Sequence, residues 1–310
     1  YLFDSLRNKI MPLAADVIVY PAHGAGSSCG KNLSKETVDT LGNQKATNYA
    51  LRANMTKEEF IKEVTDGLTP APKYFPLNVQ MNKEGYEYFA DVLARSAQAL
   101  SPEAFEIAAN DTEAVVLDVR HQDTFAKGHI PRSIFIGLDG GFAPWVGALI
   151  ADVKQPLLLI TPEGMEAEAI TRLSRVGFDH VLGYLKGGFD AWKKASKEYD
   201  TVSTIAATTF KEVKANHEVP VFDVRKEGEF LSEHVVDAHN TPLQSLNEHL
   251  TEFPEKETFY VHCAGGYRSM IAASMLKNRG IHNFIDIGGG FAAIKETAVP
   301  VSDFVCPSTL

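Results

Sequence analysis

An internal repeat constrains this chain more than any other feature of its sequence. The run Val115–Arg120, which ends in Asp-Val-Arg, recurs as Val219–Arg225, at an offset of about 105 residues. Further along, Lys186–Trp192 (Lys-Gly-Gly-Phe-Asp-Ala-Trp) is echoed by Gly288–Ile294 (Gly-Gly-Gly-Phe-Ala-Ala-Ile). Each copy alternates short apolar runs with helical patterns. This alternation predicts two α/β units of roughly 100 residues, each with a parallel sheet flanked by helices.

The most informative stretch of the second copy is Phe259–Ser269, Phe-Tyr-Val-His-Cys-Ala-Gly-Gly-Tyr-Arg-Ser. A short apolar run ends at Cys263, a turn with two glycines follows, and a helical pattern opens at Arg268 and closes near Gly280. This order predicts a strand, a tight loop and a helix. Backbone N–H groups of such a loop can converge on the sulfur, and the N-terminus of the helix favours negative charge. We therefore expect Cys263 to act as a thiolate nucleophile.

Composition excludes several classes of function. The formal net charge of −10 over 310 residues argues against a nucleic-acid surface and gives no reason to invoke an anionic membrane. No apolar run approaches the length needed to span a bilayer. The three cysteines, Cys29, Cys263 and Cys306, are too few for a disulfide framework. They indicate free thiols in a reducing compartment, so we expect a cytoplasmic location.

The first hundred residues give weaker signals. Residues 1–13 carry apolar side chains at helical spacing, and Asp16–Tyr20 predicts a buried strand that leads into a glycine-rich loop with His23. A histidine just past a strand end is a common metal-ligand position, but the spacing alone favours a surface hydrogen-bonding role. Residues 70–76 predict an extended proline-rich connector, and residues 84–100 a polar helix. Because the chain opens on what reads as the middle of a domain, we expect further residues before it.

The stretch Val19–Lys31 resembles the last metal-site loop of the metallo-β-lactamase fold, and most of all the branch that contains persulfide dioxygenases. That family's main metal motif, His-x-His-x-Asp-His, occurs nowhere in the chain. The resemblance implies that residues 1–97 are the C-terminal part of such a domain plus a connector. His23 would then be an orphan of a lost site, so we expect no metal cofactor in this chain, iron belonging to an intact dioxygenase domain. Cys29 is either incidental or carries sulfur at the mouth of that site, and Cys306 reads as incidental.

Both copies resemble rhodanese domains, and the match covers about residues 98–300. The motifs that carry it are Asp-Val-Arg at the end of a strand and Phe-x-x-x-His shortly after. In the first copy they are Asp118–Arg120 and Phe125–His129. In the second copy the matching positions are Asp223, Arg225 and His234, although the residues around this histidine, Glu233 and Asp237, replace the usual glycines.

We interpret Asp223, Arg225 and His234 as structural support, a hydrogen-bonded network that holds strand and loop. The resemblance also implies the domain bounds. These are 98–200 for a first rhodanese-like domain and 201–300 for a second, here called the first and second repeat, with a tail at 301–310.

The length of the loop that follows Cys263 bears on its chemistry. Five positions separate Cys263 from Arg268, which gives a six-residue loop including both ends. Cysteine phosphatases use one residue more because their loop must wrap a tetrahedral phosphate, so the shorter loop favours sulfur transfer. We assign Cys263 as the catalytic residue and the rest of the loop as the cradle of an anionic donor: Ala264, Gly265, Gly266, Tyr267 and Arg268. A cysteine-dependent phosphatase and a non-catalytic docking module stay as alternatives.

The first repeat lacks the residues for this chemistry. Its corresponding strand and loop, Leu157–Glu166, contain no cysteine. Glu163, Glu166 and Glu168 stand near the place where an anion cradle would be, and they would repel an anionic substrate. We therefore expect the first repeat to be inactive and to serve as a structural or docking module.

The resemblance to rhodaneses implies a sulfurtransferase that works through a persulfide on Cys263. Its donor would be thiosulfate or a low-molecular-weight persulfide such as glutathione persulfide. Its acceptor would be a thiol, sulfite or cyanide, and its parent protein would act in sulfide and persulfide oxidation. We expect small-molecule partners of this kind, no nucleic acid and no membrane, and homo-oligomerisation is left open.

Overall fold

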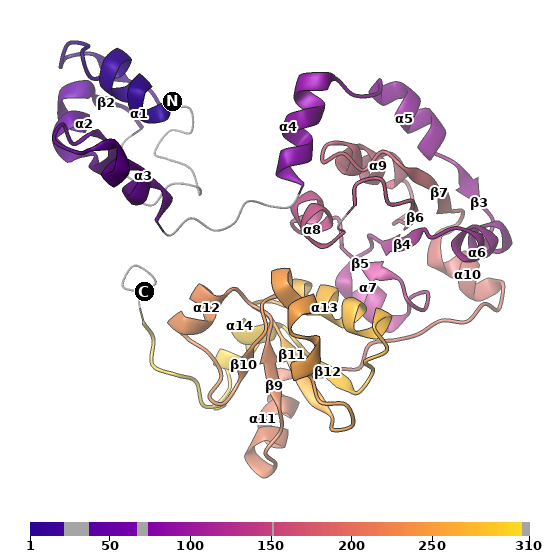
Figure 1. Ribbon diagram of the computed structural model, residues 1–310. Helices are drawn as coiled ribbons and strands as arrows, with labels where there is room; N and C mark the ends of the chain where they lie inside the picture. The colour runs from indigo at the N-terminus through magenta and orange to yellow at the C-terminus, as the bar shows by residue number, and fades with distance from the viewer. Residues whose placement is uncertain (22–36, 67–73, 151, 306–310) are drawn as a thin grey trace. The chain divides into compact units, whose positions relative to one another are not determined.

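The computed structural model describes residues 1–21, 37–66, 74–150 and 152–305, and it divides the chain into two compact units, Tyr1–Ala71 and Pro72–Leu310. Figure 1 labels their helices and strands. His23, Cys29 and Cys306 lie outside the described residues, so the interpretations placed on them stay predictions. Among the residues described, no helix combines the length and the apolar character that crossing a membrane would need.

The first unit is a small cluster of short elements. Thr56 opens helix α3 with a capping box, because its hydroxyl accepts the N–H of Glu59 and the Glu59 carboxylate accepts the N–H of Thr56. The helix buries Phe60, whose ring meets Phe3 edge to face. The elements are α1 (Leu2–Ser5), the π-helical η1 (Leu6–Ile10), β1 (Ile18–Val19), β2 (Asp39–Thr40), α2 (Leu41–Thr47), the 3-10 helix η2 (Tyr49–Leu51) and α3 (Lys57–Thr65).

Three expectations for the N-terminal hundred residues need correction. The strand predicted at Asp16–Tyr20 is only two residues long and is not buried, since Ile18 is 55% exposed and pairs with the equally short β2. The described end of the proline-rich connector is helical. Pro76 lies in the first turn of α4 (Phe75–Glu84), where a missing N–H costs nothing. The polar helix expected at 84–100 is also displaced, because α4 ends at Glu84, is capped by Gly85 with φ 93°, and α5 spans Phe89–Ser96.

The first repeat is built on a five-stranded parallel sheet with strand order β3-β7-β6-β4-β5. Its central strand β6 is apolar and buried along its whole length, as a parallel sheet covered on both faces requires. The elements are β3 (Ala99–Leu100), α6 (Pro102–Asp111), β4 (Val115–Asp118), α7 (Gln122–Lys127), β5 (Ile134–Phe135), α8 (Phe142–Leu149), β6 (Leu157–Ile160), α9 (Glu166–Ser174), β7 (Val181–Leu185) and α10 (Gly188–Lys194).

The second repeat has a parallel sheet of the same order, β8-β12-β11-β9-β10, so the fold class predicted from the repeat is confirmed. In Figure 1 the strands β9, β11 and β12 run side by side between the helices of this repeat. The elements are β8 (Thr204–Ala206), α11 (Ala207–Asn216), β9 (Val221–Asp223), α12 (Glu227–Ser232), β10 (His239–Asn240), the 3-10 helices η3 (Leu243–Glu248) and η4 (Leu250–Glu252), β11 (Phe259–His262), α13 (Tyr267–Asn278), β12 (Phe284–Gly288) and α14 (Gly290–Lys295).

Helix α13 joins the two repeats. Its residues Ser269–Leu276 are all buried, and buried side chains of both repeats form one apolar cluster around it. The Ser274 hydroxyl accepts the N–H of Phe135 in β5 at 3.0 Å, and Lys277 forms an ion pair with Asp200 at 2.8 Å. The helix that follows the cysteine loop is therefore fixed from both sides, which limits how far the loop can move.

Candidate active site

Cys263 directly follows β11, the middle strand of the second sheet, so it lies at the carboxyl edge of the sheet. Clefts outside the carboxyl ends of parallel strands are the usual ligand sites of such folds. The thiol is 1% exposed, and its Sγ accepts the N–H of Gly266 at 3.1 Å. Gly266 has φ 103°, a left-handed conformation that a glycine adopts without strain. This turn aims an N–H at the sulfur, as the strand, loop and helix pattern predicts.

A second glycine turn holds the cysteine loop from behind. The N–H of Phe291 donates to the carbonyl of Cys263 at 2.6 Å, and the N–H of Ala292 donates to that of Ala264 at 3.0 Å. Gly290 has φ 59°, and a Cβ on it would lie 2.5 Å from the Cys263 carbonyl oxygen. Because that space does not exist, a glycine is required there. The Gly-Gly-Phe echo between the repeats thus has a role that the sequence alone did not reveal.

Tyr267 turns its side chain away from the loop and into the first repeat. Its hydroxyl donates to the carbonyl of Gly137 at 2.7 Å, and its ring meets Phe135 edge to face. A Cβ on Gly140 would lie 2.3 Å from the Tyr267 ring, so a glycine at that position lets the ring dock. Burial raises the pKa of Tyr267, which keeps the phenol protonated. Tyr267 can therefore contribute its backbone, but not its side chain, to the cradle of an anionic donor.

Arg268 is not a free cation. Its guanidinium forms a two-pronged ion pair with Glu229 of α12, at 2.6 and 2.8 Å. The hydrogen bonds from Arg268 lower the pKa of Glu229, and those to Glu229 raise the pKa of Arg268. A smaller electrostatic contribution from Cys263 acts on the pKa of Arg268 in the same direction. Arg268 therefore lies within electrostatic reach of Cys263, the candidate nucleophile, but it already has an anionic partner, Glu229, that the sequence did not reveal.

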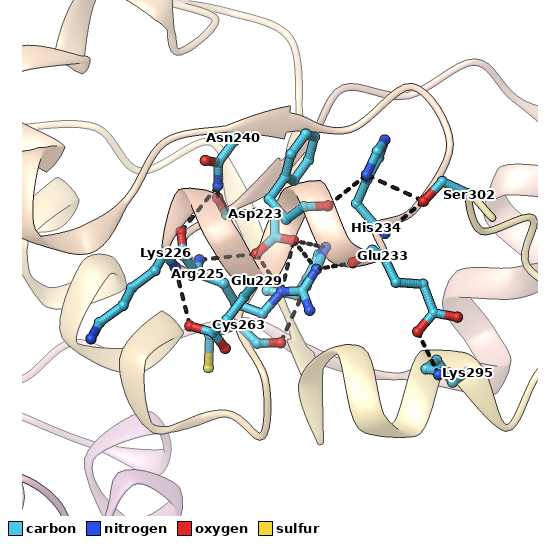
Figure 2. Close-up of polar contacts among 12 residues, drawn as sticks. Asp223, Arg225, Lys226, Glu229, Glu233, His234, Asn240, Cys263, Lys295 and Ser302 are labelled. Atoms are coloured by element: carbon cyan, nitrogen blue, oxygen red, sulfur yellow. Dashed lines mark hydrogen bonds and ion pairs between the residues drawn. The ribbon is translucent and has the colours of Figure 1, made fainter. Parts of the chain in front are cut away.

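Asp223 and Arg225 form the structural network that the sequence predicts. The Arg225 guanidinium donates through Nε and Nη2 to the Asp223 carboxylate at 2.6–3.0 Å, and Nη2 also donates to the carbonyl of Glu233 (Figure 2). Both side chains are buried. The guanidinium stacks on the ring of Phe291, 3.9 Å from its centroid. The network thus connects β9, the end of α12 and the turn behind the cysteine loop.

His234 also has a structural place. Its ring stacks on Phe230 at 3.9 Å between centroids, and Nδ1 lies 2.8 Å from the Phe230 carbonyl oxygen. Glu233 and Asp237, which replace glycines around His234, strain the backbone little. Glu233 has φ −169°, an extended conformation open to any residue, and Asp237 takes φ 66°, which aspartate tolerates. The Phe-x-x-x-His motif is therefore a stacked pair four residues apart.

The first repeat has a loop that corresponds to the cysteine loop, and the side chain of Glu166 fills it. The strand register places Thr161 where the second repeat has its cysteine, and Gly164 has a left-handed backbone like that of Gly266. Glu166 stands in the place of the arginine, and its Oε1 accepts the Thr161 hydroxyl at 3.2 Å and the Gly164 N–H at 3.3 Å. An internal carboxylate thus occupies the cradle, which supports the expectation that this repeat is inactive.

Two buried titratable groups lie behind the cysteine loop. His262 is fully buried, with Nδ1 3.2 Å from the Cys263 carbonyl oxygen and Nε2 4.0 Å from Asp223, and burial lowers its pKa. Asp286 of β12 is 2% exposed, and its Oδ1 has no hydrogen-bond partner among the described residues. Burial raises the pKa of Asp286 to about 7, opposed by a hydrogen bond from Ser269.

Asp286 should make the second repeat less stable as the pH rises. Its folded pKa of about 7 lies above the ordinary value of 3.8, so the folded state binds the extra proton between these values. The free energy of unfolding should fall through this window and level off above pH 7. The free energy of unfolding of Asp286→Asn lacks this fall, so its advantage over wild type should grow by on the order of 3 kcal/mol between pH 5 and pH 8. Urea unfolding of both proteins at each pH measures this, and parallel pH curves would contradict it.

A metal site can be assessed only within the described residues, where no group of three or more His, Cys, Asp or Glu side chains could hold an ion. His23 lies outside them, so its expected lack of iron stays a prediction. The cysteine site itself offers a thiol, backbone N–H groups and an ion-paired arginine. This set suits a nucleophilic reaction at sulfur.

Comparison with known families identifies both repeats. The profile of the rhodanese-like domain family matches residues 101–195 and 206–297. The chain belongs to the rhodanese family. The geometry above is thus that of two rhodanese domains, of which the second carries the cysteine loop.

Individual relatives cover only parts of the chain. The uncharacterized protein YibN of Escherichia coli is 36% identical over 84 residues, 27% of this chain and 58% of YibN. The putative sulfur carrier protein YrkF of Bacillus subtilis is 26% identical over 34% of this chain and 55% of YrkF. A metallo-β-lactamase structure from Staphylococcus aureus is similar with 27% identity and a TM-score of 0.45, over 60% of this chain and 49% of its own. The chain spans just over half the length of the curated relatives it matches.

Proposed function

We propose that the second rhodanese domain is a sulfurtransferase with Cys263 as its nucleophile. The observation that carries the proposal is the thiol at the carboxyl edge of β11, inside a loop that donates the Gly266 N–H to its sulfur. The relationship to a putative sulfur carrier protein supports it. The loop, six residues from Cys263 to Arg268, is too short for the phosphate cradle of cysteine phosphatases, so phosphate hydrolysis is the weaker alternative.

The reaction would run in two displacements. The Cys263 thiolate attacks the outer sulfur of the donor, a new S–S bond forms, and the donor's own S–S bond breaks. Sulfite leaves thiosulfate with the electron pair, or a thiolate leaves an organic persulfide. An acceptor (sulfite, cyanide or a thiolate) then attacks the outer sulfur of the Cys263 persulfide and returns the thiolate. Backbone N–H groups of the loop would stabilise the charge on the outer sulfur.

The wider setting is also a proposal. The resemblance around His23 suggests a parent protein in which a dioxygenase oxidises persulfide to sulfite. The rhodanese domain would then link persulfide, sulfite and thiosulfate. Thiol chemistry of this kind needs a reducing compartment, which favours the cytoplasm.

Mass spectrometry after incubation with a sulfur donor tests the function. Protein treated with thiosulfate or glutathione persulfide should gain one sulfur atom, mapped to Cys263 in peptide digests. Subsequent cyanide should remove it as thiocyanate. A protein that stays unmodified with every donor, or that hydrolyses phosphomonoesters instead, would overturn the proposal.

A further inference from the structure

Glu229 forms an ion pair with Arg268, the cation that an anionic sulfur donor would meet at the Cys263 site. Its two oxygens accept from both terminal nitrogens of Arg268, the parallel geometry that makes such pairs strong. The Arg268 side chain is 17% exposed and that of Glu229 36%, so solvent screens the pair only in part. An anion that arrives at Arg268 therefore meets a neutralised guanidinium and a carboxylate.

Further contacts of Glu229 fix the Arg268–Glu229 ion pair in place. Glu229 is the third residue of α12, and its Oε2 accepts the N–H of Lys226 at 3.2 Å (Figure 2). It also lines a cavity of about 320 Å³, together with Arg225, Gly228, Ser232, Glu233 and Phe291. Rotating the carboxylate away would break a helix cap as well as an ion pair, so this conformation is favoured.

We propose that Glu229 determines the charge selectivity of the Cys263 site, by neutralising Arg268 and disfavouring dianionic donors such as thiosulfate. The inference rests on the proposed sulfur transfer. Thiosulfate carries two negative charges, shared between its outer sulfur and the sulfonate bonded to it, so it must displace Glu229 from Arg268 or bind beside a carboxylate. An organic persulfide with an uncharged carbon chain carries at most one negative charge, so it is repelled less by Glu229 and depends less on Arg268. The carboxylate thus acts as a repulsive element against one class of donor.

The test is the variant Glu229→Gln, which keeps the side-chain size and an oxygen acceptor for the Lys226 N–H. We expect kcat/KM for thiosulfate to rise about 10-fold, mainly through a lower KM, because Arg268 regains its net charge. With the persulfide of 2-mercaptoethanol, kcat/KM should change by less than about twofold. The gain with thiosulfate should shrink in high salt, since the interaction is between charges near the surface.

Glu227→Gln is the matched control. Glu227 lies in the same helix and is exposed, so this variant makes the same change in net charge away from Arg268. It should leave both donors unaffected, and an equal gain in this control would show a general charge effect and overturn the inference. Equal losses for both donors in Glu229→Gln would also overturn it, because Glu229 would then only position the loop.

Failure of the proposed function itself would look different. If wild type takes up sulfur on Cys263 but Glu229→Gln has the donor preference of wild type, only the selectivity role is lost. If wild type never carries sulfur on Cys263, the proposed function fails and the inference falls with it.

Discussion

Replacing Cys263 by serine is expected to abolish sulfur transfer, with a loss in kcat on the order of 10³-fold or more. Serine is nearly isosteric, and its Oγ can accept the Gly266 N–H that now reaches Sγ, so the fold should persist. A serine hydroxyl is not ionised at neutral pH and cannot form a persulfide. Thiosulfate:cyanide and persulfide:thiol assays, with thermal unfolding as a check on the fold, measure the effect.

The controls for this variant are the other two thiols. Cys29→Ser and Cys306→Ser should retain wild-type transfer rates, since neither residue belongs to the proposed site. Substantial turnover in Cys263→Ser would assign the chemistry to another thiol, with Cys29 as the first suspect. Loss of activity in Cys29→Ser alone would also show that Cys29 takes part in the chemistry.

Features that depend on local pattern were predictable from the sequence. The repeated runs gave two parallel sheets of the same strand order, because alternating apolar runs and helical patterns leave few other arrangements. Cys263 follows a strand and precedes a turn at Gly266, as its neighbours in the sequence imply. Asp223 and Arg225 are only two positions apart, so their ion pair needs little tertiary information.

Features that depend on the packing of distant elements were not predictable. Glu229 and Arg268 are 39 positions apart, and Tyr267 meets Gly137 across 130 positions. No periodicity relates such positions, because their approach depends on how α13 packs against segments that are distant in the sequence. For β1 the sequence predicted a buried strand that the structure does not contain. An apolar run alone does not supply the neighbouring strands that would bury it.

Asp223→Ala should strongly destabilise the second repeat. It leaves the Arg225 guanidinium 5% exposed without its carboxylate, and a buried charge that loses its partner typically costs about 3–5 kcal/mol. Domains of this kind have total stabilities of roughly 5–15 kcal/mol, so a large part of the second repeat should be unfolded in mild denaturant. Urea unfolding compared with wild type measures the loss.

A paired substitution separates the unpaired charge from a simple loss of contacts. In Asp223→Leu with Arg225→Met the buried charge is gone, so the double variant should be more stable than Asp223→Ala. The duplicated pair in the first repeat, Asp118 and Arg120, has the same geometry and supplies a second instance, in which Asp118→Ala should cost a similar amount. A double variant as unstable as the single one would mean that the ion pair is needed for its hydrogen bonds to the chain, above all the one from Arg225 to the Glu233 carbonyl.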